Sequence, residues 1–223
     1  AFKLGDTSSH GRILALMSTR RPCRVLDVGC GPGWLSAELR KHGHEVVGVD
    51  LDPVKLDLIK SGRSPIVEEG IQELTAQVVA SGRVRVTNDV VGAVRDTDLS
   101  FICVGTPSSP NGSQDLSAVR RVSEQIGTAL KDKGGYHTVV MRSTIQPGSM
   151  DEVVKAGIEL TSGKVANRDF GLCFQPEFLR EGTSIKDYDS PPFTVIGTED
   201  PRAAEVLRSV FGHLPCDFLT TSI

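Results

Sequence analysis

Three glycines and one aspartate in the first quarter of the chain have the types and spacing of a nucleoside-binding site. Gly29, Gly31 and Gly33 follow a strand-like run in the segment VLDVGCGPG, and Asp50 follows Gly33 by 17 positions. Glycine lets backbone approach a ligand closely, and a helix N-terminus offers free N–H groups and positive potential. A carboxylate at the end of the next strand can accept hydrogen bonds from ribose hydroxyls. The pattern predicts a nucleoside-binding crossover, and the acidic Asp50 favours NAD over NADP.

The identity of the nucleoside is left open by this segment alone. Its glycines are spaced G-x-G-x-G rather than the G-x-G-x-x-G of dinucleotide-binding enzymes. With Asp27 two positions before Gly29, VLDVGCGPG resembles the first motif of S-adenosylmethionine-dependent methyltransferases. The preceding SSHGRILALM resembles the helix that leads into that motif, so we expect residues 1–22 to form a leader helix or extension. S-adenosylmethionine is therefore the alternative cofactor.

Composition and charge narrow the class of protein. The 223 residues carry a formal net charge of −3 and no run of Lys or Arg, which gives no reason to expect a nucleic-acid partner. No apolar run is long enough to cross a bilayer, so we expect no membrane association. The five cysteines lack C-x-x-C spacing, which favours neither a disulfide framework nor a metal site. These features are typical of a reduced, cytoplasmic protein.

Apolar runs alternate with helical patterns along most of the chain. Runs so apolar are typical of strands in a parallel sheet that is covered on both faces. Asp52-Pro53 and Asp200-Pro201 are helix starts, and a third helix is predicted after Asp115. The alternation predicts an α/β fold, a doubly wound, Rossmann-like and mostly parallel sheet with helices on both faces. The expected strands are CRVLDV, HEVVGV, VRVTN, LSFICV, TVVMR, FGLCF and, near the end, CDFLTTSI.

From Asp52 onward, four segments occur in the order and spacing of one enzyme family. The chain resembles the UDP-glucose/GDP-mannose dehydrogenase family over this region, and IKDYDSPPFTVIG is closer to the GDP-mannose branch. The resemblance implies that residues 23–223 form a Rossmann-like dinucleotide-binding domain, without the family's central helix and C-terminal domain. The four segments are KLDLIKSGRSPIVEEGIQEL, SFICVGTPSSPNGSQDL, VVMRSTIQPGS and QPEFLREGTSIKDYDSPPFTVIG.

The resemblance assigns roles to residues at the ends of the expected strands. Thr106 can offer its hydroxyl to the cofactor, although Thr is also an ordinary turn residue. Thr144 is expected near the nicotinamide and the reacting sugar carbon, and Lys55 near the adenosine portion. Glu177 is the candidate general acid or base, and its position between Pro176 and Phe178 predicts partial desolvation and a raised pKa.

The same segment is expected to bind the substrate. Beside Glu177, the resemblance implies that Phe178, Leu179 and Arg180 line a nucleotide-sugar site, with Glu181 as a second acidic position. Two features depart from the family pattern. Gln175 stands where the family usually has Asn, and Pro32 in the glycine segment has no N–H to donate to a phosphate.

The function implied is NAD-dependent oxidation of the C6 alcohol of GDP-mannose or UDP-glucose to the uronate, which serves polysaccharide biosynthesis. The family's catalytic cysteine belongs to a region that would follow Ile223, and neither Cys173 nor Cys216 matches its motif, so the chain alone is expected to be incapable of full turnover. Family members form homodimers through a helix after this domain, and a monomer is the alternative here. A methyltransferase and a non-catalytic nucleotide-binding module are the other hypotheses.

Overall fold

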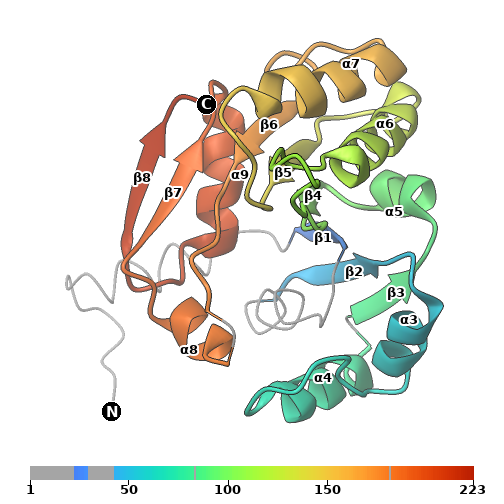
Figure 1. Cartoon of the computed structure of the whole chain (residues 1–223), viewed down its shortest axis with the longest axis vertical. Coiled ribbons are helices and arrows are strands. Elements are labelled where there is room, and N and C mark those ends of the chain that lie inside the picture. Colours follow the sequence, from blue (N-terminus) through green and yellow to red (C-terminus); the bar gives the residue numbers. More distant parts are fainter. Residues whose placement is uncertain (1–22, 30–42, 83, 181) are drawn as a thin grey trace.

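One eight-stranded sheet forms the centre of the molecule (Figure 1). The computed structural model describes residues 23–29, 43–82, 84–180 and 182–223. The strand order is β3-β2-β1-β4-β5-β6-β7-β8, and every described pairing is parallel except that of β6 with β7. The chain therefore winds outward from β1 in both directions, which confirms the predicted doubly wound, mostly parallel sheet. The strands are β1 Arg24–Val28, β2 Glu45–Val49, β3 Val84–Thr87, β4 Leu99–Ile102, β5 Thr138–Met141, β6 Gly171–Phe174, β7 Phe193–Gly197 and β8 Asp217–Thr221.

Helices cover both faces of this sheet, as the sequence predicts (Figure 1). One face is packed against α5, α6, η1 and α7, and the other against α4, α8 and α9. The element η1 is one turn of π-helix that leads directly into α7. The helices are α3 Pro53–Lys60, α4 Ile71–Ala80, α5 Val90–Asp96, α6 Ser117–Lys131, η1 Met150–Lys155, α7 Ala156–Ser162, α8 Ser184–Asp189 and α9 Pro201–Phe211.

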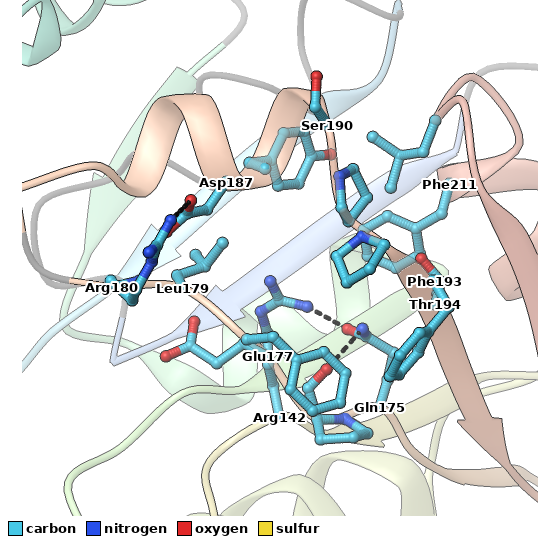
Figure 2. A pocket seen from close by; sticks show the side chains of 16 residues that line it. Arg142, Gln175, Glu177, Leu179, Arg180, Asp187, Ser190, Phe193, Thr194 and Phe211 are labelled. Atoms are coloured by element: carbon cyan, nitrogen blue, oxygen red, sulfur yellow. Dashed lines mark hydrogen bonds and ion pairs between the residues drawn. The ribbon is translucent and has the colours of Figure 1, made fainter.

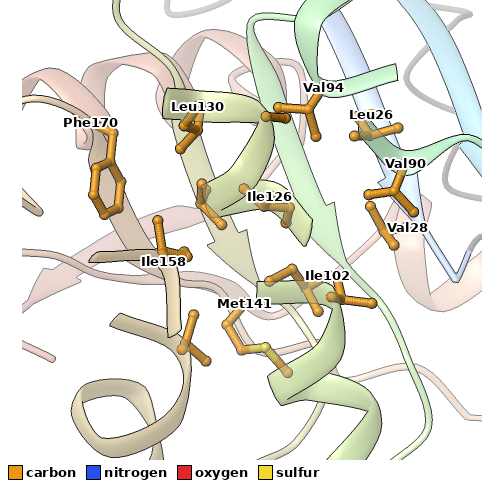
Figure 3. Close-up of a cluster of buried hydrophobic side chains, with 14 of the residues drawn as sticks. Leu26, Val28, Val90, Val94, Ile102, Ile126, Leu130, Met141, Ile158 and Phe170 are labelled. Carbon is orange, nitrogen blue, oxygen red and sulfur yellow. The ribbon is translucent and has the colours of Figure 1, made fainter. Parts of the chain in front are cut away.

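The two faces use alternate residues of each strand, because successive side chains of a strand point to opposite sides. Leu26 and Val28 of β1 join the core beneath α5 and α6, which Figure 3 shows, whereas Val25 of the same strand joins the core beneath α4 and α9. Burial on both sides explains why the strands are nearly continuous apolar runs. The core thus fixes the level at which each strand ends.

The sequence located most of these elements. Asp52 and Asp200 each cap a helix by accepting a hydrogen bond from a backbone N–H two residues later, and a proline follows each of them. The helix predicted after Asp115 is α6, which ends at Lys131, a few residues before Gly134-Gly135. Strand β7 was not among the predicted strands. Pro191-Pro192 directly precedes it, and consecutive prolines are typical of loops. Residues 1–22, for which a leader helix was expected, lie outside the described residues.

Gly127 is the point of closest approach between α6 and α7. A Cβ at this position would lie 2.7 Å from the Ile158 carbonyl oxygen and would also meet the Thr161 hydroxyl. Any larger residue must therefore push the two helices apart.

We expect Gly127→Ala to lower the free energy of unfolding by about 1–3 kcal/mol, the usual cost of overpacking. Urea unfolding followed by circular dichroism measures this change. Gly134→Ala is the matched control, since a Cβ on Gly134 meets nothing within 4 Å. Equal stability of the two variants would contradict the close approach.

His137 is buried at the amino end of β5, away from the edge where most strands end. Its Nε2 lies 2.8 Å from the Ser100 hydroxyl, and its Nδ1 lies 3.1 Å from both the Thr97 carbonyl oxygen and Lys133 Nζ. Burial, reinforced by the positive charge of Lys133, lowers the pKa of His137 to about 3 from an ordinary value of 6.5. The folded protein therefore holds this imidazole neutral.

This burial makes the fold sensitive to acid. Below pH 6.5 the unfolded chain binds a proton at His137 that the folded chain does not bind until about pH 3, so stability is lost as the pH falls through this range. Between pH 7 and pH 5 we expect this residue to contribute a loss of about 2 kcal/mol. Urea unfolding at both pH values measures it. His137→Asn, although less stable at pH 7, should lose less on acidification, and an equal loss would refute the assignment.

Candidate functional site

A cavity of about 360 Å³ opens beside the carboxyl ends of β1, β2 and β4. In this sheet β1 is the point from which the chain winds in opposite directions, and doubly wound folds bind ligands at that point. We refer to it as the first cavity. Its lining residues are Val28, Gly29, Val49, Asp50, Leu51, Lys55, Val90, Cys103, Val104, Gly105, Ala118, Arg121, Val122 and Gln125.

Asp50 directly follows β2, and its side chain is 13% exposed. One carboxylate oxygen accepts a hydrogen bond from the Asp52 backbone at 2.9 Å, and the other lies 3.8 Å from Lys55 Nζ. The carboxylate is thus held in place at the cavity wall while retaining acceptor capacity. Open space adjoins it across the cavity, where a Cβ on Gly105 would meet no atom within 4 Å. These residues fit the ribose of a nucleotide.

Gly29 has a structural requirement as well as a place in the cavity. Its φ of +77° is a left-handed conformation, and a Cβ there would lie 2.9 Å from the Cys103 carbonyl oxygen. Its N–H donates to the Val49 carbonyl oxygen at 2.7 Å. Glycine therefore allows β1, β2 and β4 to converge. Gly31, Gly33 and Pro32 lie outside the described residues.

Thr106 and Thr144, predicted as neighbours of the cofactor, are brought together by the turns that follow β4 and β5. The Thr106 hydroxyl donates to the Thr144 carbonyl oxygen at 2.9 Å, and the Gln114 amide donates to the same oxygen at 2.8 Å. Gln114 also accepts from the Gln146 backbone at 3.2 Å. The two turns are thus fastened to each other, and the Thr144 side chain remains exposed.

A second cavity, of about 300 Å³, lies between the segment after β6 and the helices α8 and α9 (Figure 2). It contains the predicted substrate residues Glu177, Phe178, Leu179 and Arg180, which therefore lie together. Glu181 lies outside the described residues. The lining residues are Arg142, Gln175, Pro176, Glu177, Phe178, Leu179, Arg180, Asp187, Tyr188, Ser190, Pro191, Pro192, Phe193, Thr194, Phe211 and Leu214.

The floor of the second cavity is a buried polar pair that sequence analysis did not identify. Arg142, 5% exposed, donates from its guanidinium to the Gln175 side-chain oxygen, and Gln175 is equally buried (Figure 2). The Gln175 amide then donates to the Pro176 carbonyl oxygen at 2.9 Å. The residue that departs from the family's Asn thus joins the strand end to the segment that carries Glu177.

Glu177 corrects one expectation. The neighbouring Pro176 and Phe178 do not enclose it, because its side chain is exposed. Phe178 is itself 49% exposed and turns toward Phe193, with ring centroids 5.3 Å apart in an edge-to-face arrangement. Phe178 therefore packs against Phe193 rather than against the carboxylate, and the predicted partial desolvation of Glu177 is wrong for this structure.

Cys173 is buried in β6, and burial raises the pKa of its thiol to about 12, so it is unsuited to nucleophilic chemistry.

Two other polar residues of the first cavity, Arg121 and Gln125, were not identified from the sequence. They lie four positions apart on α6 and so share one helix face, but only the fold reveals that this face borders the cavity.

The doubly wound sheet, with its cavity and carboxylate beside β1, defines a nucleotide-binding domain. A model of the UDP-glucose/GDP-mannose dehydrogenase family, NAD binding domain, matches residues 28–215. The GDP-mannose 6-dehydrogenase of Pseudomonas syringae pv. syringae is 49% identical over 83% of this chain, and the UDP-glucose 6-dehydrogenase AglM of Haloferax volcanii is 38% identical over 77%. The chain spans 42% and 40% of these two proteins.

Solved structures give the same result. A ternary complex of GDP-mannose dehydrogenase from Pseudomonas aeruginosa superposes with a TM-score of 0.87 at 46% identity, covering 90% of this chain and 46% of that one. A UDP-glucose dehydrogenase from Pyrobaculum islandicum gives 0.86 at 32% identity, with coverage of 92% and 47%.

The chain belongs to the UDP-glucose/GDP-mannose dehydrogenase family, and it corresponds to the family's N-terminal, NAD-binding part. The match begins within β1 and includes Gly29 and Asp50, so the methyltransferase interpretation of that segment is not favoured. In the part of the chain that the structure describes, no helix has both the length and the apolarity that a membrane crossing requires.

The Arg142–Gln175 pair yields a prediction about stability. Gln175→Leu removes an acceptor from a buried guanidinium, and we expect the free energy of unfolding to fall by about 1–3 kcal/mol. Gln175→Glu keeps an acceptor oxygen and is the matched control. Urea unfolding of the three proteins measures the difference, and a Leu variant as stable as the wild type would show that the contact contributes nothing.

Proposed function

We propose that this chain is the cofactor-binding part of an NAD-dependent nucleotide-sugar 6-dehydrogenase, which oxidises the C6 alcohol of GDP-mannose or UDP-glucose to the uronate. The observation that carries the proposal is the placement of two cavities at one edge of the sheet. The first presents the Asp50 carboxylate, and the second lies against the segment from Gln175 to Arg180. The relatives named as GDP-mannose and UDP-glucose 6-dehydrogenases support it.

The roles follow from position. Asp50 would accept hydrogen bonds from the adenosine ribose, and Lys55, 3.8 Å away, would lie near the adenosine portion. Gly29, Gly31 and Gly33, the last two outside the described residues, are proposed to let backbone approach the phosphates. When bound, NAD supplies the hydride acceptor.

The substrate is proposed to lie between the two fastened turns and the segment after β6. Thr106 and Thr144 would orient the nicotinamide end of the cofactor. Glu177, exposed at the cavity, is free to move a proton to or from the sugar hydroxyl. Phe178, Leu179 and Arg180, with Glu181, would hold the nucleotide sugar.

Further proposals concern the intact protein. We propose that the thiolate step of the second oxidation uses the cysteine of the family's C-terminal region rather than Cys173, which is buried with a raised pKa. We also propose a cytoplasmic location and a role in polysaccharide biosynthesis, and a homodimer as in the intact family, with a monomer as the alternative for this chain.

Calorimetric titration of the chain with NAD and, separately, with S-adenosylmethionine tests the cofactor assignment. We expect heat with NAD only. Asp50→Ala should weaken NAD binding by about tenfold to a hundredfold, because hydrogen bonds to a charged group contribute about 1.5–3 kcal/mol. Asp57→Ala is the matched control, as its side chain is 80% exposed on α3. Heat with S-adenosylmethionine and none with NAD would overturn the proposal.

A further inference from the structure

A single carboxylate joins two distant parts of the carboxyl edge. Glu68 lies between α3 and α4, and its Oε1 accepts hydrogen bonds from the Ser184 hydroxyl at 2.7 Å and from the Ile185 N–H at 3.4 Å. Ser184 and Ile185 begin α8, and a carboxylate at a helix N-terminus is favourably placed for the backbone N–H groups and the helix dipole. Glu68 thus anchors α8 to the segment between α3 and α4.

The segment that carries Glu68 is itself held. Gln72, in the first turn of α4, donates to the Gly62 carbonyl oxygen at 3.0 Å and accepts from the Ser64 backbone at 3.0 Å. Gly70 packs against α8, since a Cβ on Gly70 would lie 3.5 Å from Ile185 Cδ1. The contact between the two parts is therefore packed as well as hydrogen-bonded.

Asp187, in the first turn of α8, holds the substrate segment. Its carboxylate accepts from Arg180 three times, at 2.6 Å and 3.0 Å from the guanidinium and at 3.1 Å from the backbone, and it also accepts from the Thr183 hydroxyl at 3.0 Å. The Asp187 side chain is only 11% exposed, and the Arg180 guanidinium holds its pKa below the ordinary range. Figure 2 shows the pair at the rim of the second cavity.

We propose that Glu68 and Asp187 are positioning residues for the segment from Glu177 to Arg180. Glu68 fixes the start of α8, and Asp187 transmits that position to Arg180, which ends the segment. Neither residue lies among the groups assigned to the chemistry. The inference rests on the proposed function only in taking the segment as the nucleotide-sugar site.

The same anchor links substrate to cofactor. Helix α3 carries Lys55 at the first cavity, and the chain then runs through Gly62 and Ser64 to Glu68. The segment that ends at Glu68 therefore connects α3, which borders the first cavity, to the start of α8.

Limited digestion with trypsin tests the anchor without any activity. The Arg180 side chain is 76% exposed, so we expect the rate of cleavage after it to depend on how firmly the segment is held. Glu68→Ala and Asp187→Ala should each speed cleavage after Arg180 by about tenfold, equivalent to ~1.4 kcal/mol of lost restraint. Glu68→Gln keeps an acceptor oxygen and should restore most of the protection. Mass spectrometry of the fragments gives the rates.

Glu69→Ala is the matched control, as Glu69 is the exposed neighbour of Glu68. Unchanged cleavage in Glu68→Ala, or the same acceleration in Glu69→Ala, overturns the proposal. These cleavage rates do not require catalysis, so they test the positioning role separately from the proposed function. A protein that oxidises no nucleotide sugar would contradict only the proposed function.

Steady-state kinetics of the full-length protein then separates positioning from general damage. Glu68→Ala should raise the KM for the nucleotide sugar by about tenfold while changing the KM for NAD by less than about twofold, and Glu68→Gln should return the first value toward that of the wild type. An equal rise in both KM values would show a merely structural role and would overturn the proposal.

Discussion

The in-register parallel pairing of β1, β4, β5 and β6 is the constraint on which the rest of the structure depends. Val28 pairs with Ile102, Ile102 with Met141, and Met141 with Phe174, so these four strands end at one level. The residues that follow them must then stand in a row along one edge. Core packing on both faces maintains this level, because a shift of one residue would turn every buried side chain of a strand to the wrong face.

The pairing of the strands determines where each strand ends, but it does not determine the positions of the segments that follow. Those segments are held by a few polar contacts. Thr106 and Gln114 fasten the turn after β5, and Gln175 joins Arg142 to the start of the segment after β6. Asp187 and its partner Arg180 hold the far end of that segment. Charge-assisted contacts suit this task, since they are directional and short even where little apolar surface is available.

Features that depend on local sequence pattern could be predicted from the sequence. Contacts that depend on the register between strands could not. Strands such as TVVM of β5 could be predicted because burial on both faces leaves a continuous apolar run. Asp50 could be predicted because it follows such a run, downstream of the glycine segment. Arg142 and Gln175 are 33 positions apart, and only the pairing of β5 with β6 makes them partners. The exposure of Glu177 was mispredicted because apolar neighbours in sequence packed against another ring.

The reversal at β7 has an evolutionary consequence. Because β7 runs antiparallel to β6, the excursion between them departs from and re-enters the sheet at the same rim. No crossover has to span the height of the sheet there, as it must between parallel neighbours. Insertions, deletions and substitutions in this excursion therefore leave the strand pairing intact. Such changes alter the second cavity, while the first cavity, around β1, keeps its lining.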